Sequence, residues 1–270
     1  MVKDAIGILD NGLEGFSILE TLTDKFKNEN FIYLNDLVHN PYFNMPEDDA
    51  LNLIKANIKK LKDLNIKLLI VSSDIVVDAS KEYLDELNIP VLDIVSIYID
   101  YINENYEQKN IGLFGKTQII EANLYQKNFK YNRLYNISSD ELEELIVNNG
   151  LKTSQSFIKT KEAFKQIKGK DLDVLIASSP YLITLKTEIS EFTNFNEMTD
   201  FGEILANKIQ TEFMDLNVKG RGKVFVYSNV EKSKFKKMTS WSNIKYKYID
   251  LDKRKRRERQ KLFQKISKKQ

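Results

Sequence analysis

Ser73 and Ser178 each lie within two residues of the end of a short apolar run, and both are candidates for proton transfer or nucleophilic chemistry. A serine hydroxyl is a weak acid, so it needs an adjacent general base before it can take part in either reaction. The chain has one histidine, His39, and no cysteine, which excludes thiol catalysis, disulfides and thiolate metal sites. Asp10 and Asp74 are the carboxylates that the sequence offers as bases. A serine-based proton-transfer or hydrolytic site is therefore one hypothesis.

A structural role for the serines is the competing interpretation. The pairs Ser72-Ser73 and Ser178-Ser179 precede predicted helices, and serine is among the preferred residues at a helix N-cap. In this interpretation the hydroxyls accept hydrogen bonds from the first turn of each helix and do no chemistry. The sequence favours this structural role, because no histidine lies near either pair.

The elements that position these serines follow an alternating pattern. Short apolar runs alternate with amphipathic segments over the first two-thirds of the chain, which is typical of parallel βαβ units. The expected strands are Ile6–Leu9, Phe31–Leu34, Lys67–Val71, Ile89–Ile94, Ile111–Gly115, Asp173–Ala177, Lys223–Tyr227 and Ile244–Ile249. The expected helices are Gly15–Lys27, Pro46–Leu64, Ser80–Leu87, Glu141–Asn148, Thr160–Lys168 and Asp200–Phe213, with a short pattern at Glu231–Met238.

The predicted fold class is α/β, with two similar lobes, each a mostly parallel sheet flanked by helices, and the pocket between the lobes. The strand at Ile111–Gly115 restarts the pattern of the N-terminal region. We expect residues 1–96 and 206–252 to form the first lobe, 97–205 the second, and 253–270 a basic C-terminal tail. With ten glycines, four prolines and no Gly/Ser linker, the lobes are expected to be joined by ordered crossovers.

Ligands of parallel α/β sheets gather at the carboxyl ends of the strands, where helix N-termini point inward. The five loops expected there are 10–12, 36–44, 72–75, 115–117 and 178–181. Gly115-Lys116-Thr117 is similar to the end of a phosphate-binding loop. Asn110 stands where that motif requires its first glycine, so no nucleotide site is predicted.

Six short motifs on these loops share an order with a known family. They are Asp10-Asn11-Gly12, Asn35-Asp36 with Pro41-Tyr42, Leu69–Ile75, Ile111–Gly115 with Tyr125, Ile176–Tyr181, and Thr199–Glu203. Over about residues 5–250 the chain thereby resembles the glutamate racemases of the aspartate/glutamate racemase superfamily. Each motif is short, and the specificity of the resemblance comes from the order of all six.

The resemblance implies a reaction without a cofactor, in which one cysteine thiolate removes the Cα proton and a second thiol returns one. Ser73 and Ser178 occupy the two cysteine positions, and Pro180 occupies the family's histidine position. A thiol has a reference pKa of about 8.5 and exchanges protons near neutral pH, whereas a serine without a base does not. Both halves of the acid–base pair are therefore expected to be inactive.

The resemblance also implies a set of substrate-binding positions, several of which depart from the family's pattern. Phe43 replaces a glycine, and its ring is expected to fill much of a small substrate's volume. Asp74 replaces a neutral amide and is expected to repel a dicarboxylate. Ile75 stands where a hydroxyl donor is expected. The complete set is Asn11, Pro41, Tyr42, Phe43, Asn44, Asp74, Ile75 and Ser179, with Asp10 as a catalytic candidate beside the two serines.

The charge of the chain is divided unevenly. Residues 253–270 contain ten of the 41 basic residues and one of the 39 acidic ones, which gives this tail a charge of +9 and residues 1–252 a charge of −7. Such a basic run attracts phosphate backbones or an anionic membrane surface, and it can equally dock on the acidic body of another copy. A solvated terminal helix is the structural alternative. The N-terminus shows no signal-peptide pattern, so a cytoplasmic location is expected.

Three hypotheses about function remain. The first is a catalytically inactive relative of the racemases with a binding or scaffolding role, holding a small acidic ligand between the lobes. The second is an active, cofactor-independent amino-acid racemase of altered mechanism, which the resemblance would assign to D-glutamate supply for peptidoglycan. The third is a nucleic-acid- or membrane-associated protein that acts through residues 253–270. No metal or cofactor is expected, and the resemblance suggests a homodimer.

Overall fold

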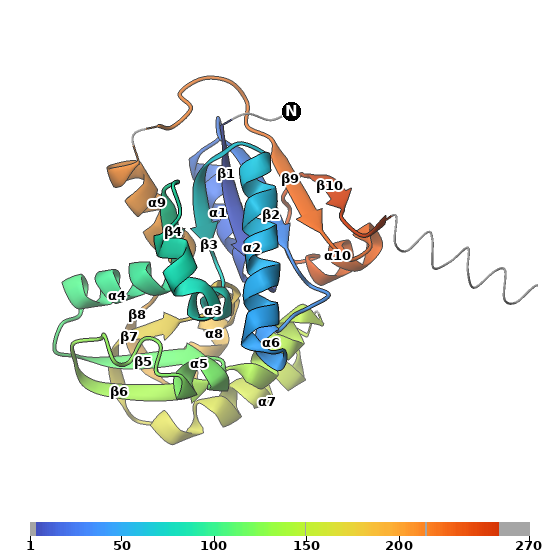
Figure 1. Ribbon diagram of the computed structural model, residues 1–270. Helices are drawn as coiled ribbons and strands as arrows, with labels where there is room; N and C mark the ends of the chain where they lie inside the picture. The colour runs from blue at the N-terminus through green and yellow to red at the C-terminus, as the bar shows by residue number, and fades with distance from the viewer. Residues whose placement is uncertain (1–3, 149, 214, 254–270) are drawn as a thin grey trace, which may run out of the picture.

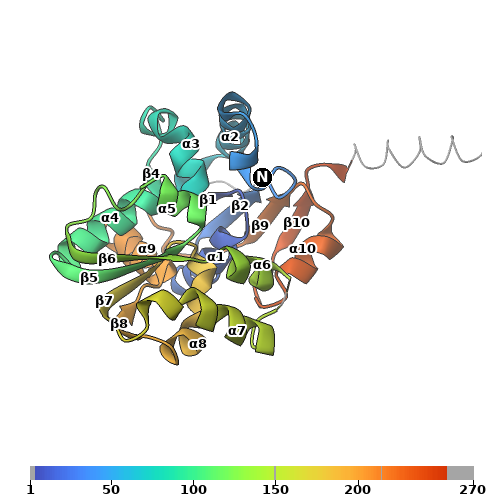
Figure 2. The same ribbon diagram turned by 90° about the horizontal axis from the view of Figure 1, so that it is seen from below.

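The computed structural model describes residues 4–148, 150–213 and 215–253. These residues form two parallel sheets, a six-stranded one and a four-stranded one, each covered by helices (Figure 1). The predicted class, α/β with two similar lobes, is confirmed. The sheets lie one above the other in Figure 1, and Figure 2 shows the same arrangement from below.

The first sheet has the strand order β10-β9-β2-β1-β3-β4. Its strands are β1 (Ala5–Asp10), β2 (Asn30–Asn35), β3 (Ile66–Val71), β4 (Val91–Asp93), β9 (Val224–Ser228) and β10 (Lys247–Asp250). The helices that connect them are α1 (Glu14–Lys25), α2 (Glu47–Asp63), α3 (Asp74–Asp85) and α10 (Lys232–Met238), with a short 3-10 turn η1 at Tyr42–Asn44. Strand β1 is completely buried, as expected of a central parallel strand that is covered on both faces.

The second sheet has the order β6-β5-β7-β8. Its strands are β5 (Lys109–Gly115), β6 (Tyr131–Ser138), β7 (Asp171–Ala177) and β8 (Asn194–Met198). Its connecting elements are α5 (Thr117–Glu121), α6 (Asp140–Val147), α7 (Ser154–Ala163), η2 (Lys165–Ile167), η3 (Pro180–Leu185) and α8 (Lys186–Ser190). Strands β6 and β8 were not predicted, because most of their side chains are half-buried or exposed and give no continuous apolar run.

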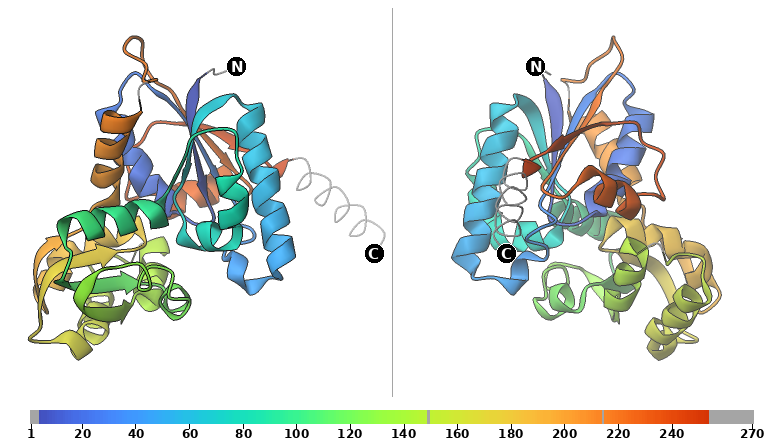
Figure 3. Two further views of the ribbon diagram at one scale, coloured as in Figure 1. Left: turned by 60° about the vertical axis from the view of Figure 1, so that its left-hand side comes forward. Right: turned by 90° about the vertical axis from the view of Figure 1, so that its right-hand side faces the viewer.

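Two helices carry the chain between the lobes (Figure 3). Helix α4 (Ile94–Asn105) leaves the first sheet, and helix α9 (Phe201–Glu212) leads back to it. The predicted boundaries near residues 97 and 206 fall inside these two helices. The rings of Tyr98 on α4 and Phe201 on α9 pack with centroids 4.9 Å apart, and Lys25 on α1 pairs with Glu203 at 2.9 Å. The crossovers are therefore ordered and packed against each other, as the scarcity of glycine suggested.

Within the described residues, no helix is both long and apolar enough to cross a membrane.

Candidate functional site

The turn after β1 is fixed by the carboxyl group of Asp10. Its Oδ1 accepts a hydrogen bond from the Gly12 amide at 2.8 Å, and its Oδ2 accepts bonds from the Gly15 amide and the Tyr33 hydroxyl at 2.7 Å each. Asp10 is completely buried. Burial, and then the negative charge of Glu14, raise the pKa of Asp10 to about 8. Asp10 therefore holds the start of α1 in place and carries a proton at neutral pH.

The loop after β2 is tied to the same turn by amide and hydroxyl groups. Asn11 donates from Nδ2 to the Asp36 carbonyl at 3.1 Å, and its Oδ1 accepts from the Tyr42 amide at 2.9 Å. The Tyr42 hydroxyl donates to Asp36 Oδ2 at 2.9 Å, and the His39 ring contacts Asp36 Oδ1 at 2.7 Å. Tyr42 is 1% exposed. Asn11 and Tyr42, predicted to bind substrate, are thus engaged in bonds within the first lobe.

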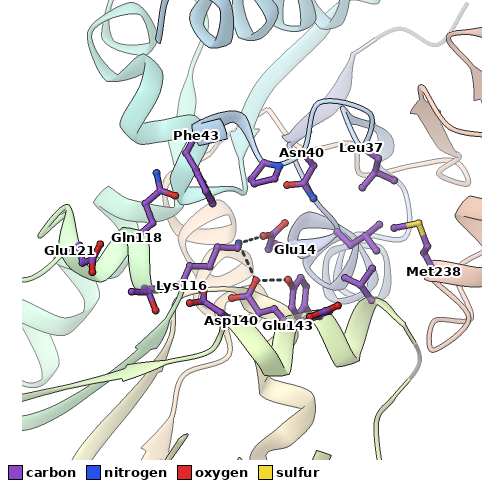
Figure 4. Close-up of a pocket in the computed structure, with 17 residues that line it drawn as sticks. Glu14, Leu37, Asn40, Phe43, Lys116, Gln118, Glu121, Asp140, Glu143 and Met238 are labelled. Atoms are coloured by element: carbon purple, nitrogen blue, oxygen red, sulfur yellow. Dashed lines mark hydrogen bonds and ion pairs between the residues drawn. The ribbon is translucent and has the colours of Figure 1, made fainter. Parts of the chain in front are cut away.

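An ion cluster joins the two lobes (Figure 4). The Lys116 ammonium, which follows β5, contacts Glu14 Oε1 of α1 at 2.5 Å and Glu143 Oε2 of α6 at 3.1 Å. It also donates to the Ser179 hydroxyl at 3.3 Å. An ammonium group has three donors, so these three contacts use its full capacity. We call Lys116, Glu14 and Glu143 the interlobe cluster.

Further hydrogen bonds hold the interlobe cluster on the side of the second lobe. Ser179 donates to Glu143 Oε1 at 2.8 Å, Ser139 donates to the same oxygen at 2.6 Å, and the Tyr181 hydroxyl donates to Glu143 Oε2 at 2.6 Å. Burial, and then the charge of Glu143, raise the pKa of Tyr181, which therefore stays a donor. Glu143 is thus fixed at both oxygens.

Burial and charge act against each other within the cluster. Burial alone would lower the pKa of Lys116, but the carboxylates of Glu14, Glu143 and Asp74 outweigh it and raise that pKa well above its usual range. Burial alone would raise the pKa of Glu14, but the charge and hydrogen bond of Lys116 lower it. Lys116 is therefore cationic and Glu14 anionic at neutral pH.

The two serines at the predicted catalytic positions lie at the carboxyl ends of β3 and β7. Ser73 is 2% exposed and Ser178 is 1% exposed. Ser178 Oγ has no hydrogen-bond partner among the described residues. No hydrogen bond that the described residues make joins either hydroxyl to a carboxylate or to His39, whose ring faces Asp36. Within the described part of the chain, neither hydroxyl is therefore hydrogen-bonded to a base.

The capping interpretation of the serine pairs is wrong at each residue. Ser73 is the N-cap of α3 and Ser179 that of η3, and neither makes a side-chain cap bond. Ser72 instead donates to the Leu9 carbonyl at 3.0 Å, and Ser179 joins Glu143. For Ser72 and Ser179 the reason is local competition, because each hydroxyl donates to an acceptor on a neighbouring strand or helix.

Asp74 and Ile75 begin α3 beside the interlobe cluster. Burial raises the pKa of Asp74 to about 7, with Lys116 opposing the shift and Glu14 and Glu143 adding to it. Asp74 Oδ1 accepts from the Ile75 amide at 2.8 Å, while Oδ2 has no partner among the described residues. The neighbouring Tyr125 hydroxyl also lacks a partner, and burial, followed by the charge of Asp74, raises its pKa.

An open cleft of about 620 Å³ lies beside the cluster. Of the predicted substrate-binding residues, Pro41 and Phe43 line it, and Phe43 is 42% exposed. Its ring points into the cleft toward Lys116 (Figure 4), so the expectation that it takes up substrate volume stays a prediction. Asn44 is exposed in η1. Ile75 lines a smaller cavity of about 370 Å³, which also includes Phe43.

Known proteins with similar sequences and structures show which fold this chain has. No protein-family model matches the chain. Two similar sequences are the glutamate racemases of Lactobacillus acidophilus, 23% identical over 72% of this chain and 74% of that protein, and of Aquifex pyrophilus, 24% identical over 78% and 84%.

Similar solved structures include a glutamate racemase isoform from Bacillus anthracis, with a TM-score of 0.80 at 19% identity, covering 93% of this chain and 98% of that one. The glutamate racemase of Francisella tularensis, solved in complex with D-glutamate, gives a TM-score of 0.78 at 17% identity over 92% and 97%. The chain has the glutamate racemase fold. The resemblance stated from the six motifs is thereby confirmed.

The sequence reasoning missed two members of the interlobe cluster in this racemase-like chain. Lys116 was noticed as part of a Gly-Lys-Thr tripeptide, but Glu14 and Glu143 were not singled out. A signal was present at Glu14, because an acidic residue directly after a glycine-containing turn and before an apolar helix face is a common helix start. That Glu14 meets Lys116, 102 residues away, depends on how the lobes pack.

Among the described residues, no group of three or more His, Cys, Asp or Glu side chains could hold a metal ion. The basic tail predicted at residues 253–270 lies outside the described residues, except for Lys253.

Proposed function

We propose that this racemase-like protein does not invert amino acids and serves a binding or scaffolding role. The observation that carries the proposal is the interlobe cluster. Lys116, Glu14 and Glu143 all act on the pKa of Asp74, the residue that follows Ser73. The cluster therefore lies close to Asp74. The bond from Lys116 to Ser179 puts it beside the residue that follows Ser178. The cluster thus lies close to the residues that follow Ser73 and Ser178, and this supports the proposal if these serines stand at the family's thiol positions.

The charges also oppose a dicarboxylate ligand in this space. Lys116 has no donor left, and the amides of Gly12, Gly15 and Tyr42 already bond to Asp10 and Asn11. Within the described part of the chain, the carboxyl groups of Glu14, Asp74 and Glu143 surround one lysine, Lys116. Glutamate would bring two further negative charges to a site that has an excess of acceptors. Binding of a small acidic ligand, expected from the sequence, stays a prediction. These negative charges disfavour it.

Deuterium exchange at Cα tests the proposal. The purified full chain is incubated with L- or D-glutamate in heavy water, and incorporation is followed by NMR. We expect no exchange above the buffer background, because neither serine hydroxyl is hydrogen-bonded to a base within the described residues. Protein-dependent exchange that disappears in Ser73→Ala or Ser178→Ala would contradict the proposal.

A reconstructed variant separates the two causes of inactivity. Ser73→Cys with Ser178→Cys restores both thiols but leaves the interlobe cluster in place. We expect this variant also to lack exchange, because Lys116 and its carboxylates still occupy the interlobe space. Exchange in the double variant would show that the missing thiols alone silence the natural chain.

The raised pKa of Asp74 favours a second candidate function. A carboxyl group with a pKa of about 7 and an unpartnered oxygen is suited to general acid–base catalysis at neutral pH. An enzyme of altered mechanism would use it next to Ser73. The same exchange measurement with other amino acids, repeated with Asp74→Asn, tests this candidate, and exchange that survives the substitution would count against it.

A further inference from the structure

The walls of the 620 Å³ cleft divide into an apolar part and an acidic part. Its apolar residues include Leu13, Leu37, Val147 and Met238, and its acidic residues are Glu14, Glu121, Asp140, Glu143 and Glu144. Figure 4 shows Leu37 and Met238 toward one end of the cleft and Glu121 toward the other, with Lys116 between them. Such a surface suits a partner that carries both cationic and apolar side chains.

The carboxylates at the rim have no cationic partner. Glu121, Asp140 and Glu144 are exposed, and no lysine or arginine within the described residues forms a salt bridge with any of them. The single lysine of the cleft, Lys116, is already saturated. In the wall of the cleft, Glu14 is 5% exposed, and its Oε2 has no hydrogen-bond partner among the described residues.

The C-terminal segment leaves the protein at the same edge. The parallel register aligns Asp250 of β10 with Ser228, Ser228 with Asn35, and Asn35 with Asp10. With neighbouring strands about 4.8 Å apart, Asp250 lies roughly 14 Å from Asp10 along this row. Gly12, two residues beyond Asp10, lines the cleft. The segment that follows β10 therefore starts close to the mouth of the cleft.

The composition and length of residues 253–270 match the cleft. The segment carries a charge of +9 and three large apolar residues, Leu262, Phe263 and Ile266. The residues from 254 onward can span up to about 55 Å when extended and about 25 Å as a helix, so both exceed the distance to the cleft. Because the segment is tethered beside the cleft, its effective concentration there is high.

We propose that the acidic cleft binds this chain's own basic C-terminal segment, residues 253–270. Lysines and arginines of the segment pair with Glu121, Asp140 and Glu144, and its apolar residues lie against the apolar wall. The proposal goes beyond the absence of racemization and does not depend on it.

Spin labels on the full chain test the proposal, and the absence of native cysteine allows two labels to be placed without interference. Ser267→Cys puts one label in the segment, and Asn148→Cys puts the other beside Val147 in the cleft wall. Pulsed electron spin resonance then reports the distance between them. At low salt we expect a well-defined short distance, and between about 0.05 M and 0.5 M salt its population should fall at least about threefold, because screening weakens the pairing.

Two charge-matched variants decide the outcome. Glu121→Gln with Asp140→Asn and Glu144→Gln should abolish the short distance. The control, Glu47→Gln with Asp48→Asn and Asp49→Asn on the exposed start of α2, removes the same charge elsewhere and should leave it unchanged. All six positions are exposed, so circular dichroism should show both variants folded.

Two outcomes would overturn the proposal. One is a distance distribution that does not respond to the cleft substitutions, or responds equally to both variants. The other is a short distance that arises only when singly labelled copies are mixed, which would assign the segment to a second molecule.

Discussion

Lysine–glutamate pairs with little exposure lie in two regions of the described residues, and the regions differ in what surrounds the carboxylate. Lys67 on β3 pairs with Glu29 at 3.1 Å, and their side chains are 8% and 1% exposed. Glu29 also accepts hydrogen bonds from the backbone amide and the side chain of Asn217, within the first lobe. In the interlobe cluster, Glu14 depends on Lys116 alone for a charged donor.

The difference shows that the same kind of ion pair, lysine with glutamate, has different roles in the two regions. Around Lys67 the pair fixes the segment that leads from α9 back to β9, and its carboxylate would keep donors without the lysine. Between the lobes, Lys116 neutralises one carboxylate from each lobe. Removing Lys116 should therefore leave more buried negative charge without a cation than removing Lys67.

Lys116→Met should have the largest effect. The substitution leaves Glu14 and Glu143 buried without a cation, and breaking a buried pair in this way costs about 3–5 kcal/mol. Urea titration at pH 7 measures the free energy of unfolding. Lys116→Met combined with Glu14→Gln should recover part of the lost stability. A loss below about 1 kcal/mol in Lys116→Met alone would contradict the expected difference between Lys116 and Lys67.

Lys67→Met should cost less, about 1–3 kcal/mol, because Asn217 continues to donate to both oxygens of Glu29. The same titration compares the two variants directly. An equal or larger loss than in Lys116→Met would show that the remaining donors around Glu29 do not compensate for the lysine.

The raised pKa values of Asp10 and Asp74 in the interlobe region should make the free energy of unfolding depend on pH. The pKa of Asp10 is raised to about 8, so the native protein keeps this proton between pH 4 and 8 while the unfolded chain has released it. The unfolded state then binds fewer protons, and the free energy of unfolding falls as pH rises, by up to about 1.4 kcal/mol per pH unit. Asp74, with a pKa of about 7, adds to this fall below that pH. Asp10→Asn should flatten the profile, and a stability that rises from pH 5 to 8 would contradict the sign.

Ser178→Ala should have the smallest effect, within about 1 kcal/mol and in the stabilising direction, because the hydroxyl is buried without a partner. Ser72→Ala is the matched control, since Ser72 donates to the Leu9 carbonyl and should lose about 1 kcal/mol. Thermal unfolding of both variants distinguishes them, and a clear loss of stability in Ser178→Ala would indicate a partner for its hydroxyl.

Much of the fold could be predicted because the central strands are continuous apolar runs. The pattern located the core strands β1, β3, β5 and β7 within two residues of their bounds. Helix α4 was missed because its segment Ile94–Asn105 is apolar on several faces and merges with the preceding strand. The motifs also placed Ser73 and Ser178 after the correct strands.

The chemistry of the site was harder to predict. The sequence showed that thiols are absent, and this follows from residue types alone. It did not show that Lys116 meets carboxylates on α1 and α6, because that contact depends on the angle between two lobes. It also suggested that Phe43 would take up substrate volume, and Phe43 does line the cleft.

Strand β10 ends the first sheet with an edge that no further strand covers within the described residues. An uncovered edge invites pairing with the same edge of another molecule, and such pairing leads to aggregation. The lysine at position 247 lies on this strand, and Lys245 precedes it. A lysine on an edge strand disfavours such pairing, because its charge would have to be taken out of water between the two strands.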